Sequence, residues 1–183
     1  MPAGSTPGGL PYPEDTDAVK QGAQAIKALA QAIEAQPWIS FARWTQGTVA
    51  GAADAIVSAW DLTEGNFAAN DAGGGFTCPK AGLYLVTVDL EFSCAWPAGG
   101  PLVSVGAKTS SAPPREIYLQ RAEASSAGAT RRSYSVSGLL RMAVGETCRA
   151  FMNNGTGISI QHSSGITAND RHSTRFSARW VAP

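Results

Sequence analysis

The chain has 183 residues and carries 14 basic and 14 acidic side chains, so its formal net charge at pH 7 is zero. The basic excess of a general nucleic-acid binder is therefore missing, and there is no run of about 18 apolar residues that could span a membrane. Hydrophobic residues make up 44% of the chain, too many for a disordered protein, whereas charged residues make up only 15% of it, against about 25% in an average soluble domain.

The first 14 residues are rich in proline and glycine and show no apolar periodicity. They contain neither the basic region nor the apolar run of a secretory signal. This composition is typical of an extended tether. We therefore predict that residues 1–14 form an extended arm that anchors the protein to other components of an assembly.

Residues 15–36 are expected to form a helix. Asp15, Thr16 and Asp17 are good N-cap residues, and Pro37 ends the segment. Apolar or small residues recur with heptad spacing, which predicts a seam for self-association. The seam residues are Val19, Gly22, Ile26, Leu29 and Ile33. The alternative is a single amphipathic helix that packs on its own domain.

From residue 37 onward the apolar residues alternate with a period of two, which predicts β-strands. The clearest case is residues 82–93, where the residues expected to face the core are Tyr84, Val86, Val88, Leu90 and Phe92. Other expected strands are residues 39–44, 55–62, 102–108, 116–122, 133–142, 146–152, 157–161 and 174–181. Turn clusters separate them, for example residues 71–75 and 97–101. Residues 37–183 are thus predicted to form an antiparallel jelly-roll sandwich of about eight to ten strands.

The sequence offers little for catalysis, for a metal or for a cofactor. His162 and His172 are ten residues apart and lack metal-ligand spacing. Asp89 and Glu91 share one side of a strand about 7 Å apart, as in some glycosidases, although any half-exposed strand has such a polar side. The cysteines Cys78, Cys94 and Cys148 are expected to be small apolar residues in strands. We predict no enzyme activity, no metal and no cofactor.

Aromatic and basic residues give the best binding candidates. Trp96 lies in a predicted loop, where its ring could stack on a sugar or pack into a subunit interface. Trp38, Trp44 and Trp60 lie in or beside strands and are expected in the core. Basic residues gather toward the C-terminus, where they could bind an anionic polymer or pair with a neighbouring subunit. These residues are Arg131, Arg132, Arg171, Arg175 and Arg179.

The zero net charge is the sum of two unlike halves. Residues 1–107 carry 4 basic and 10 acidic side chains, for a net charge of −6, and residues 108–183 carry 10 basic and 4 acidic, for a net charge of +6. Strands from the two halves interleave in a jelly roll, so opposite charges can meet within one chain or between chains. Low net charge also favours association.

Two stretches resemble known families. Residues 10–17 (Leu-Pro-Tyr-Pro-Glu-Asp-Thr-Asp), followed by residues 22–30 (Gly-Ala-Gln-Ala-Ile-Lys-Ala-Leu-Ala), resemble the N-terminal segment of virion proteins of tailed phages that infect actinobacteria. In those proteins, a proline-rich arm leads into a short helix that often assembles as a trimer. This resemblance implies a trimeric coiled coil for residues 15–36.

The second resemblance is to C1q/TNF-like trimeric jelly rolls. Residues 76–86 (Phe-Thr-Cys-Pro-Lys-Ala-Gly-Leu-Tyr-Leu-Val) look like their central signature, an aromatic followed by a turn with proline, glycine and tyrosine and then a long alternating strand. Residues 176–181 then resemble the last strand of that fold, and residues 137–146 the penultimate hairpin. The chain departs from C1q in lacking a collagen-like stalk.

Together the resemblances imply a structural phage virion protein, a homotrimeric tail-fibre, tail-tip or head-fibre (decoration) component that assembles in the host cytoplasm. Its expected partners are two further copies, other virion proteins at the arm and a host-surface glycan, with neither nucleic acid nor membrane among them. The alternatives are a carbohydrate-binding module of a trimeric receptor-binding protein, with the sugar at Trp96, and a glycan-degrading enzyme that uses Asp89 and Glu91.

Overall fold

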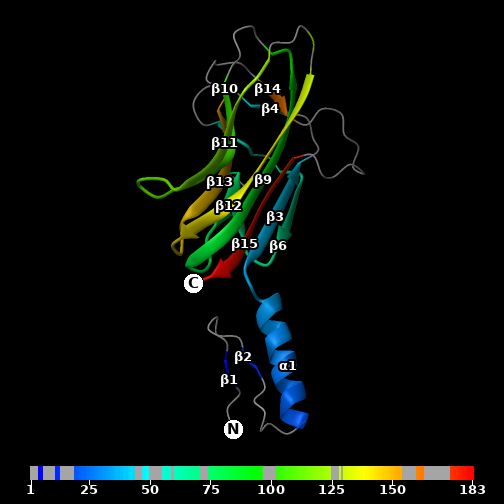
Figure 1. Ribbon diagram of the computed structural model, residues 1–183, viewed down its shortest axis with the longest axis vertical. Coiled ribbons are helices and arrows are strands. Elements are labelled where there is room, and N and C mark those ends of the chain that lie inside the picture. Colours follow the sequence, from blue (N-terminus) through cyan, green and yellow to red (C-terminus); the bar gives the residue numbers. More distant parts are fainter. Residues whose placement is uncertain are drawn as a thin grey trace.

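The structure is a computed structural model of the chain. The residues that it describes are 4–5, 11–12, 19–43, 47–49, 55–58, 60–70, 74–96, 102–124, 128, 130–153, 160–162 and 174–183. A β-sandwich forms the body of the molecule, and one helix projects from it as a stalk (Figure 1). The C-terminus lies at the end of the sandwich that carries the stalk (Figure 1).

The stalk is helix α1 (Val19–Glu34), which lies inside the predicted range. The expected N-cap residues 15–17 lie outside the described residues. At the other end, Gln36 N donates a hydrogen bond to Ile33 O at 3.2 Å, and Pro37 cannot extend the helix. The described part of the predicted arm forms a small antiparallel ladder beside α1, between β1 (Gly4–Ser5) and β2 (Pro11–Tyr12).

The larger sheet has seven antiparallel strands, in the order β4-β14-β9-β15-β3-β6, with β12 also paired to β9. The central strand β9 (Gly82–Cys94) pairs with β12 (Thr130–Met142) along its whole length. On its other side β9 pairs with β15 (Thr174–Ala182) and with β14 (Ile160–His162). The remaining strands are β3 (Trp38–Arg43), β4 (Gly47–Val49) and β6 (Leu62–Gly65).

The smaller sheet has six antiparallel strands, in the order β11-β10-β13-β8-β7, with β5 also paired to β13. Its strands are β5 (Ala55–Ile56), β7 (Ala69–Asn70), β8 (Gly75–Thr77), β10 (Leu102–Thr109), β11 (Glu116–Ala122) and β13 (Thr147–Asn153). The two sheets enclose one hydrophobic core. The predicted antiparallel sandwich is therefore confirmed.

Aromatic rings fill the centre of the core. Phe176 of β15 stacks on Phe41 of β3, with ring centroids 5.5 Å apart, and on Phe76 of β8 at 5.7 Å. Phe76 in turn contacts the ring of Tyr84, so the two sheets are joined by aromatic contacts. All five residues of β9 that were expected to face the core are fully buried, which confirms the alternation of that strand.

Some strand predictions are wrong in detail. The expected strand 55–62 is two short strands in different sheets, since β5 pairs with β13 and β6 with β3. The expected turn 71–75 ends earlier, because Gly75 begins β8. A Cβ atom on Gly75 would lie 2.0 Å from Cys148 O, so this glycine permits a close strand approach. Trp60 packs against the core as expected; Trp44 lies outside the described residues.

Candidate interaction surface

The outward side of the larger sheet carries two rows of side chains that run across β12, β9, β15 and β3. We call these residues the outer sheet face. The register aligns Leu139, Leu85, Arg179 and Trp38 in one row. It aligns Ser137, Thr87, Ser177 and Ser40 in the next row.

The first row is exposed, and it is apolar except for Arg179. Leu139 is 57% exposed and Trp38 is 40% exposed, and Leu85 lies open between them. The predicted core position of Trp38 is therefore wrong, because its parity places it on the outer side of β3. Exposed apolar side chains that gather on one surface are typical of a site that contacts another molecule.

The second row is polar but electrically neutral. The hydroxyls of Thr87 and Ser137 hydrogen-bond to each other at 2.9 Å. Short side chains leave the sheet flat, and hydroxyls that already have a partner are cheaper to remove from water than free ones. The outer sheet face can therefore be covered by another protein surface at little cost.

A groove lies where the outer sheet face meets the C-terminal end of α1. Its volume is about 540 Å³. The side chains that matter most here are Ile33 and Glu34 of the stalk, Trp38 of β3, Leu85 of β9 and Arg179 of β15. The groove joins the apolar row of the sheet to the exposed side of the stalk.

The stalk is fastened to the sandwich at this point. The side-chain amide of Asn66 donates to Glu34 O at 3.2 Å and to Gln36 O at 2.8 Å, and its oxygen accepts from Trp38 N at 2.9 Å. Trp180 N of the last strand donates to Pro37 O at 2.8 Å. These bonds fix the direction in which the helix leaves the sandwich.

The predicted seam residues lie mostly on the open side of the stalk. Ile26 is 61% exposed and Ile33 is also exposed, whereas Gly22 and Leu29 are half-buried. The side chain of Val19 lies outside the described set. Within the described helix, the buried side chain is that of Ala25, so the large apolar seam residues do not pack on the sandwich.

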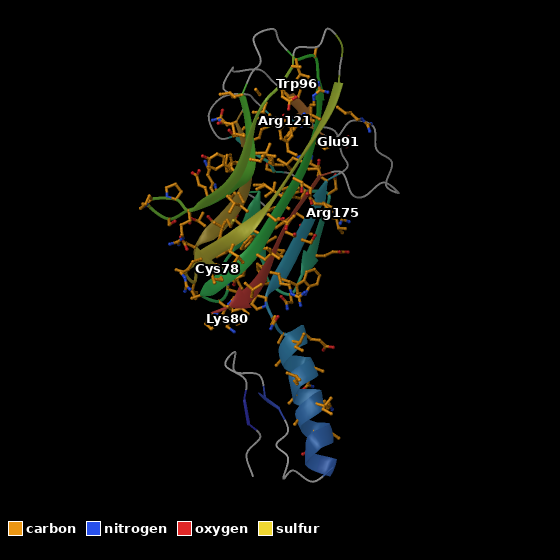
Figure 2. All side chains as sticks on the ribbon, in the orientation of Figure 1. Cys78, Lys80, Glu91, Trp96, Arg121 and Arg175 are labelled. Carbon is orange, nitrogen blue, oxygen red and sulfur yellow. The ribbon has the colours of Figure 1, made fainter. Side chains whose placement is uncertain are left out.

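Trp96 does not occupy the exposed loop position expected for it. Only 3% of the residue is exposed, and its ring belongs to the hydrophobic core (Figure 2). The ring is thus not available to stack on a sugar or to contact a neighbouring subunit. Trp96 has the same parity as Leu90 and Phe92, so the alternation of β9, continued by two residues, places its ring on the core side.

The acidic pair Asp89 and Glu91 already has partners within the chain. Asp89 accepts a hydrogen bond from Ser135 Oγ at 2.5 Å, and Glu91 lies 3.5 Å from Arg131 Nε. Arg131 belongs to the basic half of the sequence and Glu91 to the acidic half, so interleaved strands do bring the two halves together. Glu91 therefore takes part in an ionic contact on the sheet and Asp89 in a hydrogen bond, and nothing in the geometry of the two carboxylates favours glycoside hydrolysis.

A buried ionic network lies near the end of the sandwich away from the stalk. The carboxylate of Glu123 accepts hydrogen bonds from Tyr134 Oη at 2.5 Å and Arg132 Nε at 2.8 Å, with Arg121 Nε at 3.4 Å. Only 2% of Glu123 is exposed. Burial, followed by the hydrogen bond to this carboxylate, raises the pKa of Tyr134 far above its ordinary value. Two of the arginines expected to face a ligand or a neighbour are therefore used inside the chain: Arg132 here and Arg131 at Glu91.

The remaining chemical candidates are inert or undescribed. Cys78 and Cys148 are buried free thiols, as expected, and burial raises the pKa of Cys148 to about 12. A thiol with so high a pKa is a poor nucleophile. The described residues contain no group of three or more metal-ligating side chains. His172 and Arg171 lie outside the described residues, and so does the side chain of His162.

No helix within the described residues is long and apolar enough to cross a membrane. No family model matches the chain, and no curated protein matches it in sequence. Among solved structures, the globular domain of zebrafish complement 1qA protein is similar, with a TM-score of 0.55 and 14% identity. The match covers 80% of this chain and 98% of that one.

The sandwich is a C1q-like jelly roll. The predicted C1q-like jelly-roll fold is thereby confirmed. The short helix precedes this jelly roll in the chain.

Proposed function

We propose that this chain is a non-catalytic structural component of a tailed-phage virion, present as a homotrimer that projects the jelly roll from the particle. Its place is a tail fibre, a tail tip or a head fibre, where residues 1–14 anchor it to other virion proteins. The resemblance of residues 10–30 to actinobacteriophage virion segments supports this setting. The observation that carries the homotrimer is the exposed apolar side of α1, with Ile26 and Ile33.

The stalk gains stability from neighbouring copies. Helical stability in proteins comes mainly from packing an apolar side against another element rather than from the helix alone. α1 has 16 residues, and its large apolar side chains point away from the sandwich. A coiled coil of identical stalks buries these side chains, and Gly22 permits the helices to approach closely.

Assembly on the stalk also brings the sandwiches together. The junction at Asn66 and Pro37 holds each stalk in a fixed direction, so the outer sheet faces of neighbouring copies can meet. Three linked jelly rolls present the same surface three times. Several weak contacts to a host surface then add through high effective concentration.

Charging the seam is expected to dissociate the trimer. In the double variant Ile26→Glu and Ile33→Glu, both new carboxylates lie on exposed positions of the single chain, so its fold is retained. In the coiled coil they would be buried beside their own copies, which costs several kcal/mol per trimer. Light scattering after size-exclusion chromatography measures the mass.

The matched control is Gln24→Glu with Gln31→Glu, which adds the same charge to exposed positions on the other side of α1. We expect the control to keep the mass of the unmodified chain. A seam variant with that same mass would contradict assembly through the stalk.

The virion role is tested by comparing particles that carry the full chain with particles whose copy lacks residues 1–14. We expect the full chain at a copy number divisible by three, and the truncated chain in the unassembled fraction. Quantitative mass spectrometry of gradient-purified particles measures both. Particles free of the full chain would contradict the virion role, and a truncated chain at normal copy number would contradict anchoring by the arm.

A further inference from the structure

We infer that the groove between α1 and the outer sheet face is the seat of a second copy of this chain, with Glu34 of one copy paired to Arg179 of the next. This inference rests on the proposed homotrimer and adds to it the contact that sets the position of one copy against another. The groove residues come from both the stalk and the sandwich, so a neighbour seated there would contact both.

Exposed apolar side chains line the groove. Trp38 and Leu85 line it and are exposed, and Ile33 extends it along the stalk. Large aromatic side chains in such positions often supply most of the free energy of a protein contact. The groove is also continuous with the seam of the stalk through Ile33, so a copy that packs on the seam reaches the groove.

The charges in the groove complement each other without being paired. Glu34 and Arg179 both line it and both are exposed. Within the described part of the chain, neither side chain forms an ion pair. The carboxylate comes from the stalk and the guanidinium from β15, and each is open to an opposite charge from elsewhere.

Symmetry brings these two charges together. Copies related by rotation about an axis parallel to the stalk keep every residue at the same height along that axis. In a closed ring of three, one patch of a copy meets a different patch of its neighbour. Glu34 and Arg179 line the same groove and so lie at a similar height along the axis. The carboxylate of one copy can therefore meet the guanidinium of the next.

A charge swap tests the pairing. The variants Glu34→Arg and Arg179→Glu each place like charges together at the interface, and each is expected to raise the dissociation constant of the trimer by about tenfold or more. The double variant Glu34→Arg with Arg179→Glu restores the opposite charges and is expected to lie within about threefold of the unmodified chain. Sedimentation equilibrium of the full chain over a range of concentrations measures all four proteins.

The matched control is Lys27→Glu, a charge reversal on an exposed position of α1 that lies about 10 Å further from the sandwich. It is expected to leave the dissociation constant unchanged. If the unmodified chain is a trimer and the single reversals do not weaken it, or the double variant does not recover, the inference is overturned while the homotrimer stands. If the unmodified chain is a monomer, the homotrimer itself fails.

Discussion

Replacing Gly82 by alanine is expected to lower the free energy of unfolding by about 3–5 kcal/mol. Gly82 has φ +145°, a conformation that L-residues with side chains rarely adopt. A Cβ atom there would also lie 2.2 Å from Ala182 O and 2.5 Å from Trp180 Nε1. Both the backbone strain and the clash with the last strand therefore oppose the alanine. Urea denaturation followed by circular dichroism measures the difference.

Gly145→Ala is the control that isolates the clash. Gly145 also has a positive φ, +83°, but a Cβ atom on it would meet nothing within 4 Å. We expect this variant to lose only about 1 kcal/mol, from backbone strain. Equal losses at the two glycines would show that the close approach of β15 to Gly82 is unimportant. The difference between the two variants measures how much the close approach of β15 contributes to the requirement for glycine at position 82.

Replacing Glu123 by alanine is expected to lower the free energy of unfolding by about 3–5 kcal/mol, because it removes a buried carboxylate that balances the half-buried Arg132 and accepts from the buried Tyr134. Arg132 and the hydroxyl of Tyr134 would both lose their acceptor. Tyr134→Phe removes one donor only and is expected to cost about 1–3 kcal/mol. Thermal and urea denaturation of the purified variants measure both losses.

Glu116→Ala is the control for this network. Glu116 belongs to the neighbouring strand β11 but is exposed, so its removal is expected to change the free energy of unfolding by at most about 0.5 kcal/mol. A Glu123→Ala variant as stable as Glu116→Ala would mean that the buried carboxylate contributes nothing net to the fold.

The part of the fold that follows from local pattern is predictable from the sequence. Strict alternation in residues 82–93 identifies β9 and its buried side, and the exposed polar residues follow by parity. The same parity, applied to β3, would have placed Trp38 beside Ser40 on the outer side, since Ile39 and Phe41 define the inner one. The size of the Trp38 side chain is thus a poorer guide to its burial than its parity in the strand.

Other features depend on contacts between distant segments and leave no local pattern. Gly75 looks like part of a flexible turn, yet it begins a strand because β13 approaches it closely. The network at Glu123 arises only once β11 and β12 lie side by side, so no spacing of residues could have indicated it.

The groove combines a residue that local pattern predicts with a residue that only the fold places there. The seam residue Ile33 could be named from heptad spacing, and its exposure agrees with a partner outside the chain. The presence of Arg179 in the same groove as Glu34 depends instead on the register of β15 with β3 and on the direction of the stalk. Heptad spacing therefore predicts the stalk as an assembly element, and the fold shows which exposed surface continues it.

The homotrimer is tested most directly by the mass of the unmodified full chain in solution. Sedimentation equilibrium at micromolar concentration, in moderate salt, reports that mass without reference to shape. A trimer of the 18.9 kDa chain gives three times that value. We expect the threefold mass, whereas a stable species of 18.9 kDa across the whole concentration range would contradict assembly through the stalk and the groove.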